Sequence, residues 1–182
     1  MIHFKNIKKS FESNHVLRNV NLEINRGQSM AIIGGSGSGK SVLVKTVLGL
    51  IKPDGGTIIV DGVDVNETTH DQFLERFGML FQGGALFDSL SVWKNVAFRL
   101  QRGSQKRSKD EAREISIKKL RRVGLGPEIA DKYPAELSGG MQKRVSLARA
   151  IATDPEIIFF DEPTTGLDPI MSSVINELIR EI

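Results

Sequence analysis

The chain has 182 residues, of which 26% are charged, a formal net charge of +3 and no cysteine. A chain of this length can bury one well-cored domain, and the lack of cysteine excludes a disulfide scaffold and a thiolate metal site. The net charge is small, and the basic runs are typical of solvated surfaces, so the sequence argues against a nucleic-acid partner.

The first sixty residues predict mainly β-structure. Short apolar runs alternate there with turn signals, and they predict strands over residues 2–7, 16–24, 30–33 and 57–60. Phe11 lies between the first two of these strands. It is a candidate for stacking on an adenine ring, although an aromatic residue between two strands is equally typical of a core.

A glycine-rich loop follows the predicted strand at residues 30–33. Residues 34–41 read GGSGSGKS, which fits the pattern of glycine, four free positions, glycine, lysine and a hydroxyl residue. Residues 41–50 predict a helix, so loop amides and a helix N-terminus converge on one anion, for which a nucleotide polyphosphate is the best candidate. The predicted binding residues are Gly34, Gly35, Ser36, Gly37, Ser38, Gly39, Lys40 and Ser41.

The last two residues of this loop have distinct predicted roles. Lys40 would reach the β- and γ-phosphates, and the Ser41 hydroxyl would bind Mg²⁺, the hard cation that accompanies ATP or GTP. The alternative is a Gly/Ser turn that precedes a lysine by chance, which the strand, loop and helix order disfavours.

The middle of the chain predicts a helical section. A short helix runs through residue 77, a strand over 79–82 ends in Gln82, and helical patterns follow at 92–100 and 110–123. Gln82 is a candidate for contact with Mg²⁺ or the attacking water, and an ordinary surface glutamine is the alternative. Ser138, Gly139 and Gly140 then precede a helix over 141–152, whose N-terminal amides attract anions. A helix cap with two glycines is the alternative here.

The last apolar run predicts a buried strand over residues 156–160 that ends in Asp161 and Glu162, with a final helix over 169–182. Open α/β sheets bind ligands at the carboxyl ends of their strands. Asp161 would hold Mg²⁺ through its water shell, and Glu162 would polarise the water that attacks the γ-phosphate. A strand that merely ends in polar residues is the alternative, and the phosphate loop favours the functional interpretation.

The order of these motifs resembles the ATP-binding cassette (ABC) ATPases over essentially the whole chain. The resemblance rests on the phosphate loop, Gln82, LSGG at 137–140, the DE pair and GLDP at 166–169. It implies an α/β P-loop NTPase fold with a mostly parallel core sheet, an antiparallel β-subdomain and a helical subdomain. The implied division is a β-subdomain and phosphate-loop core over 1–82, a helical signature subdomain over about 83–152, and the DE strand and GLDP segment over 153–182.

The same resemblance implies ATP and Mg²⁺ as cofactors and a homodimer of nucleotide-binding domains. In that dimer Ser138, Gly139 and Gly140 of one copy cap the γ-phosphate that the glycine loop of the other copy holds. Asp168 would cross the same interface.

A finer resemblance is to the Mla/Mce/Mkl subgroup of bacterial ABC ATPases. It rests on MLFQGGALFDSLSVWKNVAF at 79–98, YPAELSGGM at 133–141 and DPIM at 168–171. It implies ATP hydrolysis on the cytoplasmic face of the inner membrane, coupled to phospholipid or other hydrophobic solute transport. The implied partners are an integral membrane permease, gripped by the stretch after Gln82, and a Mce-type substrate-binding protein.

Other functions are alternatives of different strength. Import of an amino acid or another small polar solute is the alternative within transport. A DNA-repair protein is disfavoured because only 54 residues, 83–136, separate Gln82 from Leu137 and leave no room for a coiled coil. A ribosome-acting protein is disfavoured because the chain carries one cassette.

The chain departs from the family in its histidines. The family has a switch histidine on a strand after the GLDP helix, whereas His3, His15 and His70 all precede Asp161. In related ATPases that strand lies between the phosphate-loop strand and the DE strand, so its absence would expose apolar faces and unpaired ladder groups. We therefore expect a C-terminally truncated cassette that binds ATP poorly and hydrolyses almost none, and an inactive fragment is the remaining alternative.

Overall fold

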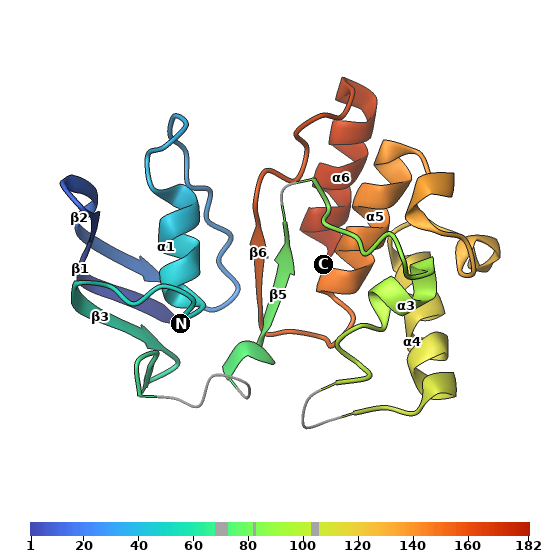
Figure 1. Cartoon of the computed structure of the whole chain (residues 1–182), viewed down its shortest axis with the longest axis horizontal. Coiled ribbons are helices and arrows are strands. Elements are labelled where there is room, and N and C mark those ends of the chain that lie inside the picture. The colour runs from blue at the N-terminus through green and yellow to red at the C-terminus, as the bar shows by residue number, and fades with distance from the viewer. Residues whose placement is uncertain (68–72, 82, 103–105) are drawn as a thin grey trace. The chain divides into compact units, whose positions relative to one another are not determined.

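The computed structural model describes residues 1–67, 73–81, 83–102 and 106–182 (Figure 1). Contacts divide the chain into two compact units, Met1–Leu74 and Glu75–Ile182. The first contains the glycine loop, and the second contains the LSGG tract and the DE pair.

The first unit is built on an antiparallel sheet with the strand order β2-β1-β3-β4. Its strands are β1 (Ile2–Phe11), β2 (Asn14–Ile24), β3 (Gly55–Val60) and β4 (Val63–Asp64). Apolar side chains such as Ile2, Phe4 and Ile58 are buried, which follows from the alternation of apolar residues along half-buried strands. Helix α1 (Lys40–Val47) buries Leu43 and Val47. The sheet confirms the prediction of an antiparallel β-region in the first sixty residues.

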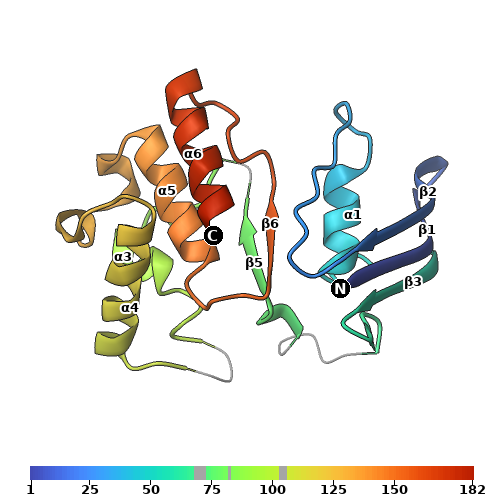
Figure 2. The same ribbon diagram turned by 180° about the vertical axis from the view of Figure 1, so that it is seen from behind.

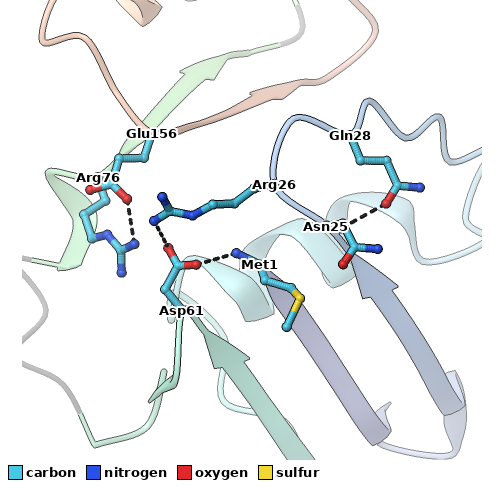
Figure 3. A network of polar contacts seen from close by, with 7 residues as sticks. All are labelled: Met1, Asn25, Arg26, Gln28, Asp61, Arg76 and Glu156. Atoms are coloured by element: carbon cyan, nitrogen blue, oxygen red, sulfur yellow. Dashed lines mark hydrogen bonds and ion pairs between the residues drawn. The ribbon is translucent and has the colours of Figure 1, made fainter.

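Polar contacts join the edges of these elements (Figure 3). In the first unit the α-ammonium group of Met1 contacts the carboxylate of Asp61, and Arg26 Nη2 lies 3.3 Å from the other oxygen of the same carboxylate. In the second unit Arg76 Nη2 donates to Glu156 Oε2 at 2.7 Å. This ion pair joins the residues that lead into β5 and β6.

The second unit contains a parallel strand pair covered by helices. The pair consists of β5 (Phe77–Leu80) and β6 (Ile157–Phe160), aligned so that Phe77 lies opposite Ile157 and Leu80 opposite Phe160. The helices are α3 (Val92–Val96), α4 (Lys109–Arg122), α5 (Gly139–Ala150) and α6 (Pro169–Glu181). Two short 3-10 helices, Pro127–Ile129 and Pro134–Glu136, connect α4 to α5.

One hydrophobic core holds the second unit together. It is formed by side chains of β5, α3, α4 and α5, including Leu80, Val92, Leu120, Val145 and Leu147, all of which are completely buried. Helix α6 lies beside α5 in both views (Figures 1 and 2), and Ile175 is its buried residue. The helices of this part of the chain therefore share one core with β5.

Local sequence signals explain where the helices begin. Ser108 and Glu111 form a capping box at the start of α4, with Ser108 Oγ accepting from the Glu111 amide and Glu111 Oε2 accepting from the Ser108 amide. Ser138 caps α5 and Asp168 caps α6, each through a side-chain oxygen that accepts from backbone amides of the first turn. In the described part of the chain, no helix combines the length and apolar character that a bilayer span requires.

The mixed α/β class with an antiparallel β-region and a parallel strand pair is confirmed, with small shifts of boundaries. The strand predicted at 79–82 is β5, which ends at Leu80, and the helix predicted at 92–100 is α3, which ends at Val96. Gln82, His70 and part of the short helix predicted to end at residue 77 lie outside the described residues. The subdomain boundaries expected from the family stay a prediction.

The strand predicted at residues 30–33 is wrong. These residues are irregular, and Met30, Ile32 and Ile33 are 38%, 44% and 94% exposed. A strand requires a neighbour with which to form ladder hydrogen bonds, and within the described ranges no strand pairs with this segment. The expected burial of the strand that ends at Phe160 is also wrong, because all four residues of β6 are only half-buried.

Candidate nucleotide-binding site

The glycine loop leads directly into α1. Gly39 is the N-cap of the helix and Lys40 its first residue, as the sequence pattern predicts for a phosphate loop. Among the described residues, the only amide of residues 34–41 with a hydrogen-bond acceptor is that of Ser38, which donates to Gly35 O at 3.3 Å. The other loop amides are therefore available for an anion, which fits the predicted phosphate cradle.

Gly39 brings the loop into contact with β2. Its φ is +94°, and an added Cβ would lie 2.9 Å from Val16 Cγ1 and 3.2 Å from both Leu17 Cδ2 and Val16 O. Only glycine fits this combination of left-handed backbone and close approach. The hairpin that carries Phe11 and the phosphate loop are thus fixed to each other within one unit.

Lys40 lies back on the loop that precedes it. Its Nζ donates to Gly34 O at 2.7 Å and to Gly35 O at 2.9 Å. These bonds hold the ammonium group beside the loop amides, where a phosphate would need a positive charge. Ser41 follows in the first turn of α1 and is exposed.

Phe11 ends β1 opposite Asn14, and 45% of its surface is exposed. Exposure argues for the stacking role over the core alternative. Lys9 Nζ lies 5.5 Å from the centre of the Phe11 ring and 2.7 Å from Asp54 Oδ1. The hydrogen bond from Lys9, followed by that from the Ser10 amide, lowers the pKa of Asp54. Sequence reasoning missed Lys9 and Asp54, because they lie 45 positions apart and no local pattern predicts their contact.

The LSGG tract forms the start of α5. Ser138 Oγ accepts from the Met141 amide at 3.3 Å, so the helix-cap interpretation is correct and is compatible with anion binding. Ser138 and Gly139 are exposed, and an added Cβ on Gly139 would meet no atom within 4 Å. Gly140 packs against α6, because its added Cβ would lie 2.7 Å from Met171 Cε.

The two acidic residues directly follow β6. The Asp161 amide donates to Leu80 O at 2.9 Å, which extends the parallel ladder by one bond. Glu162 is exposed and has a φ of +48°, which side chains rarely adopt. Thr165 holds this conformation, because its Oγ1 donates to Glu162 Oε2 at 3.1 Å and its amide donates to Glu162 O at 3.3 Å. Such backbone strain is frequent at functional sites.

The carboxylates present suit a cation that also binds phosphate. The described residues contain no cluster of three or more His, Cys, Asp or Glu side chains that could hold a metal. Mg²⁺ typically takes one or two protein ligands and completes its shell with water and phosphate oxygens. The Ser41 hydroxyl in the first unit and the Asp161 carboxylate in the second are each a ligand type that Mg²⁺ accepts, while Gln82 lies outside the described residues.

Each unit brings part of the predicted site together. The first unit contains Phe11 and the loop of Gly34, Gly35, Ser36, Gly37, Ser38, Gly39, Lys40 and Ser41, and Gly39 of the loop contacts Val16 and Leu17 of the β1-β2 pair. The second places Ser138 to Gly140 at one helix start and Asp161 with Glu162 at one strand end. Thr165 is a further member that the sequence interpretation missed.

Comparison with known proteins identifies the family. The sequence profile of the ABC transporter family matches residues 17–165. This chain belongs to the ABC transporter family. The match contains the glycine loop, the LSGG tract and the DE pair, so the resemblance inferred from the motifs is confirmed.

Two relatives illustrate the subgroup. The chain is 43% identical to the probable ribonucleotide transport ATP-binding protein mkl of Mycobacterium leprae, and the match covers all of the chain and 52% of the relative. It is 42% identical to the intermembrane phospholipid transport system ATP-binding protein MlaF of Haemophilus influenzae, with 100% and 69% covered. The predicted Mla/Mkl-type resemblance is thereby confirmed, and the chain spans about half the length of the mycobacterial relative.

A solved structure shares the fold. The ATP-binding cassette MJ0796, in a dimeric post-hydrolysis state bound to ADP and Pi, superposes with a TM-score of 0.87 at 33% identity. The match covers all of the chain and 82% of the solved chain. The cassette fold predicted from the motifs is therefore confirmed for a partial cassette.

Proposed function

We propose that this chain is the ATP-binding and ATP-hydrolysing part of a bacterial ABC transporter. The observation that carries the proposal is the glycine loop, whose amides are available and whose Lys40 begins α1. Gly39 contacts β2, the strand paired with the one that ends at Phe11, so the loop and Phe11 belong to one compact unit, which suits a ligand with a base at one end and phosphates at the other.

The residues have separate roles in this proposal. Phe11 stacks on the adenine, the loop amides bind the phosphates, and Lys40 turns from the Gly34 and Gly35 carbonyls to the β- and γ-phosphates. Mg²⁺, when bound, would neutralise charge on the phosphates, and Ser41 and Asp161 would be its protein ligands, with Gln82 as a further candidate.

Hydrolysis in this proposal depends on Glu162 and on a second copy of the chain. Glu162 accepts a proton from the attacking water, and Thr165 holds its carboxylate in place. The dimeric state of the solved MJ0796 cassette supports a homodimer. In it, Ser138, Gly139 and Gly140 of one copy meet the γ-phosphate on the other, because they form a helix N-terminus, which attracts anions, and Ser138 and Gly139 are exposed there.

The transported substrate is proposed to be a phospholipid or another hydrophobic solute. The name of the MlaF relative, which refers to intermembrane phospholipid transport, supports this choice. The proposal places the chain on the cytoplasmic face of the inner membrane, bound to an integral permease and in a complex with a Mce-type substrate-binding protein. The name of the mkl relative, which refers to ribonucleotide transport, supports a polar solute as the second candidate.

Titration calorimetry with Mg-ATP tests the nucleotide part. We expect the wild-type chain to bind and Lys40→Ala to lose at least tenfold in affinity, since a lysine that contacts two phosphates is removed. Lys45→Ala removes an exposed lysine from the same helix and should bind as the wild type does. Equal affinities of the two variants would contradict the role of Lys40.

Transport measurements in cells that carry the complete system separate the two substrate classes. We expect Glu162→Gln to abolish movement of labelled phospholipid between the two membranes, and Glu177→Gln, an exposed change on α6, to leave it intact. Loss of ribonucleotide uptake with unchanged phospholipid movement would favour the second candidate.

A further inference from the structure

The loop that joins β5 to α3, residues 83–91, is held by side chains of α5. Gly84 O accepts hydrogen bonds from Ser146 Oγ and from Arg149 Nη2, both at 2.8 Å. Ala85 O accepts from Arg149 Nη1, also at 2.8 Å. One guanidinium group therefore bridges two successive carbonyls of the loop, which is the planar, two-pronged geometry that arginine favours.

The loop backbone also touches α5 directly. An added Cβ on Gly84 would lie 2.8 Å from Ser146 Oγ and 3.8 Å from Gln142 O, and the φ of Gly84 is +83°. Ser146 is completely buried beneath this contact. The close approach and the backbone conformation both require glycine, so the sequence is adapted to bring the loop onto the helix.

The other half of the loop is held by α3. Asn95 is completely buried, its Oδ1 accepts from the Phe87 amide at 2.8 Å, and its Nδ2 donates to Phe87 O at 3.0 Å and to Leu90 O at 2.9 Å. Helices α3 and α5 pack in the same core. The loop, α3 and α5 therefore form one body within the second unit.

An exposed aromatic side chain lies on this fixed loop. Phe87 is 41% exposed, and its ring stacks on that of Phe98 with centres 4.5 Å apart. Arg149 Cζ lies 5.8 Å from the Phe87 ring, and burial lowers the pKa of this arginine. A partner that binds at Phe87 therefore contacts a loop that Arg149 connects to α5.

We propose that Arg149 and Ser146 are positioning residues that fix the Phe87 loop to α5, so that a load on Phe87 moves the Ser138 end of the same helix. About eleven residues separate Arg149 from Ser138, which is roughly 16 Å of rigid helix. The proposal rests on the proposed function, because the exposed start of α5 matters only if it meets the nucleotide of a second copy.

Arg149 and Ser146 together form a clamp that holds the Phe87 loop on α5. Hydrogen exchange of the 182-residue chain tests this clamp without any nucleotide. Arg149→Lys keeps the charge but replaces the planar two-pronged group, whose Nη1 and Nη2 each reach one carbonyl, by a single nitrogen on a shorter stem, which weakens the bridge. We expect the amides of residues 84–90 to exchange roughly tenfold faster in this variant, with α5 itself unchanged. Arg144→Lys is the matched control, because Arg144 also lies on α5 and donates to a glycine carbonyl, that of Gly124, away from the loop.

Equal exchange of the loop in the two variants would overturn the clamp. If Arg149→Lys does not fold, Ser146→Ala replaces it, because it removes one donor to Gly84 O and little volume. The amides of residues 84–90 should then exchange faster in Ser146→Ala than in Arg144→Lys, and equal exchange would overturn the clamp.

Steady-state ATP hydrolysis by the complete transporter tests the coupling of the Phe87 loop to the Ser138 end of α5. We expect Arg149→Lys to lower kcat by roughly tenfold and to leave KM for Mg-ATP within about twofold, because the phosphate loop lies in the other unit. A parallel change of KM, or an unchanged kcat, would overturn the coupling. A complete wild-type transporter that neither binds nor hydrolyses Mg-ATP would overturn the proposed function, while the exchange result would still decide the clamp.

Discussion

Asp168 has a structural role in its own chain that can be separated from the role the family implies for it at a dimer interface. Its Oδ1 accepts from the Ile170 and Met171 amides, both at 3.0 Å, at the start of α6. Removing such a cap costs about 1 kcal/mol, and losing a negative charge at a helix N-terminus costs about 0.3–1 kcal/mol more. For Asp168→Ala we therefore expect a loss of about 1–2 kcal/mol.

That loss corresponds to a fall of roughly 3–6 °C in Tm for a chain of this size. Asp168→Asn keeps an acceptor at the cap and should lose only a few tenths of a kcal/mol. Thermal and urea unfolding of both variants measure the difference. Equal stability of Asp168→Ala and the wild type, or equal losses in the two variants, would refute the cap as the source of the effect.

The asparagine variant also isolates the dimer role. Because it retains the helix cap, a fall in ATP turnover without a fall in Tm would come from the lost charge at the interface and not from unfolding of α6. A turnover equal to that of the wild type would show that the carboxylate of Asp168 acts only within its own chain.

Three further predictions concern stability. Ser108→Ala removes the capping box with Glu111 and should cost about 1 kcal/mol in urea unfolding. The pKa of Asp54 is lowered from its usual 3.8, so its contribution to stability is present above that value and is lost as the pH falls through the folded pKa. Asp54→Asn removes the ion pair with Lys9, so the free energy of unfolding of this variant should fall less steeply at acid pH. Gly39→Ala forces a Cβ to within 2.9 Å of β2 at a positive φ, and it should cost about 1–3 kcal/mol and weaken Mg-ATP binding.

Each of these predictions has a defined control. Ser173→Ala alters an exposed serine inside α6 and should leave urea unfolding unchanged. If the free energy of unfolding falls equally at acid pH in the wild type and in Asp54→Asn, the assignment to Asp54 is contradicted. Gly35→Ala is the control for Gly39, because its added Cβ would meet no atom within 4 Å. If both glycine variants lost the same stability, the contact with β2 would not be the cause.

The motifs were predictable because each is encoded over a few neighbouring residues. The pattern GGSGSGKS predicts a loop before a helix, and α1 begins at its lysine. Ser138 precedes two glycines and caps α5, and Asp161 ends an apolar run that forms β6. Local spacing is sufficient in these cases, since the interactions that define each element lie within it.

The supporting contacts were not predictable, because they join residues far apart in the sequence. Arg149 and Ala85 are 64 positions apart, and Lys9 and Asp54 are 45 apart. No local pattern identifies such a pair, since it is the packing of whole elements that brings the two residues together. The left-handed backbone of Glu162 was not predicted either, because a positive φ is uncommon for residues other than glycine and no local pattern marks it.

The failure at residues 30–33 has a physical cause of the same kind. Helix α1 satisfies its backbone internally and therefore forms wherever its own sequence favours it, whereas a strand needs a partner for every ladder hydrogen bond. Among the described strands, β6 pairs with β5 alone and the 30–33 segment pairs with none, so Ile33 remains 94% exposed. An apolar run thus predicts a capacity to form a strand, and only the neighbouring strand decides whether that capacity is realised.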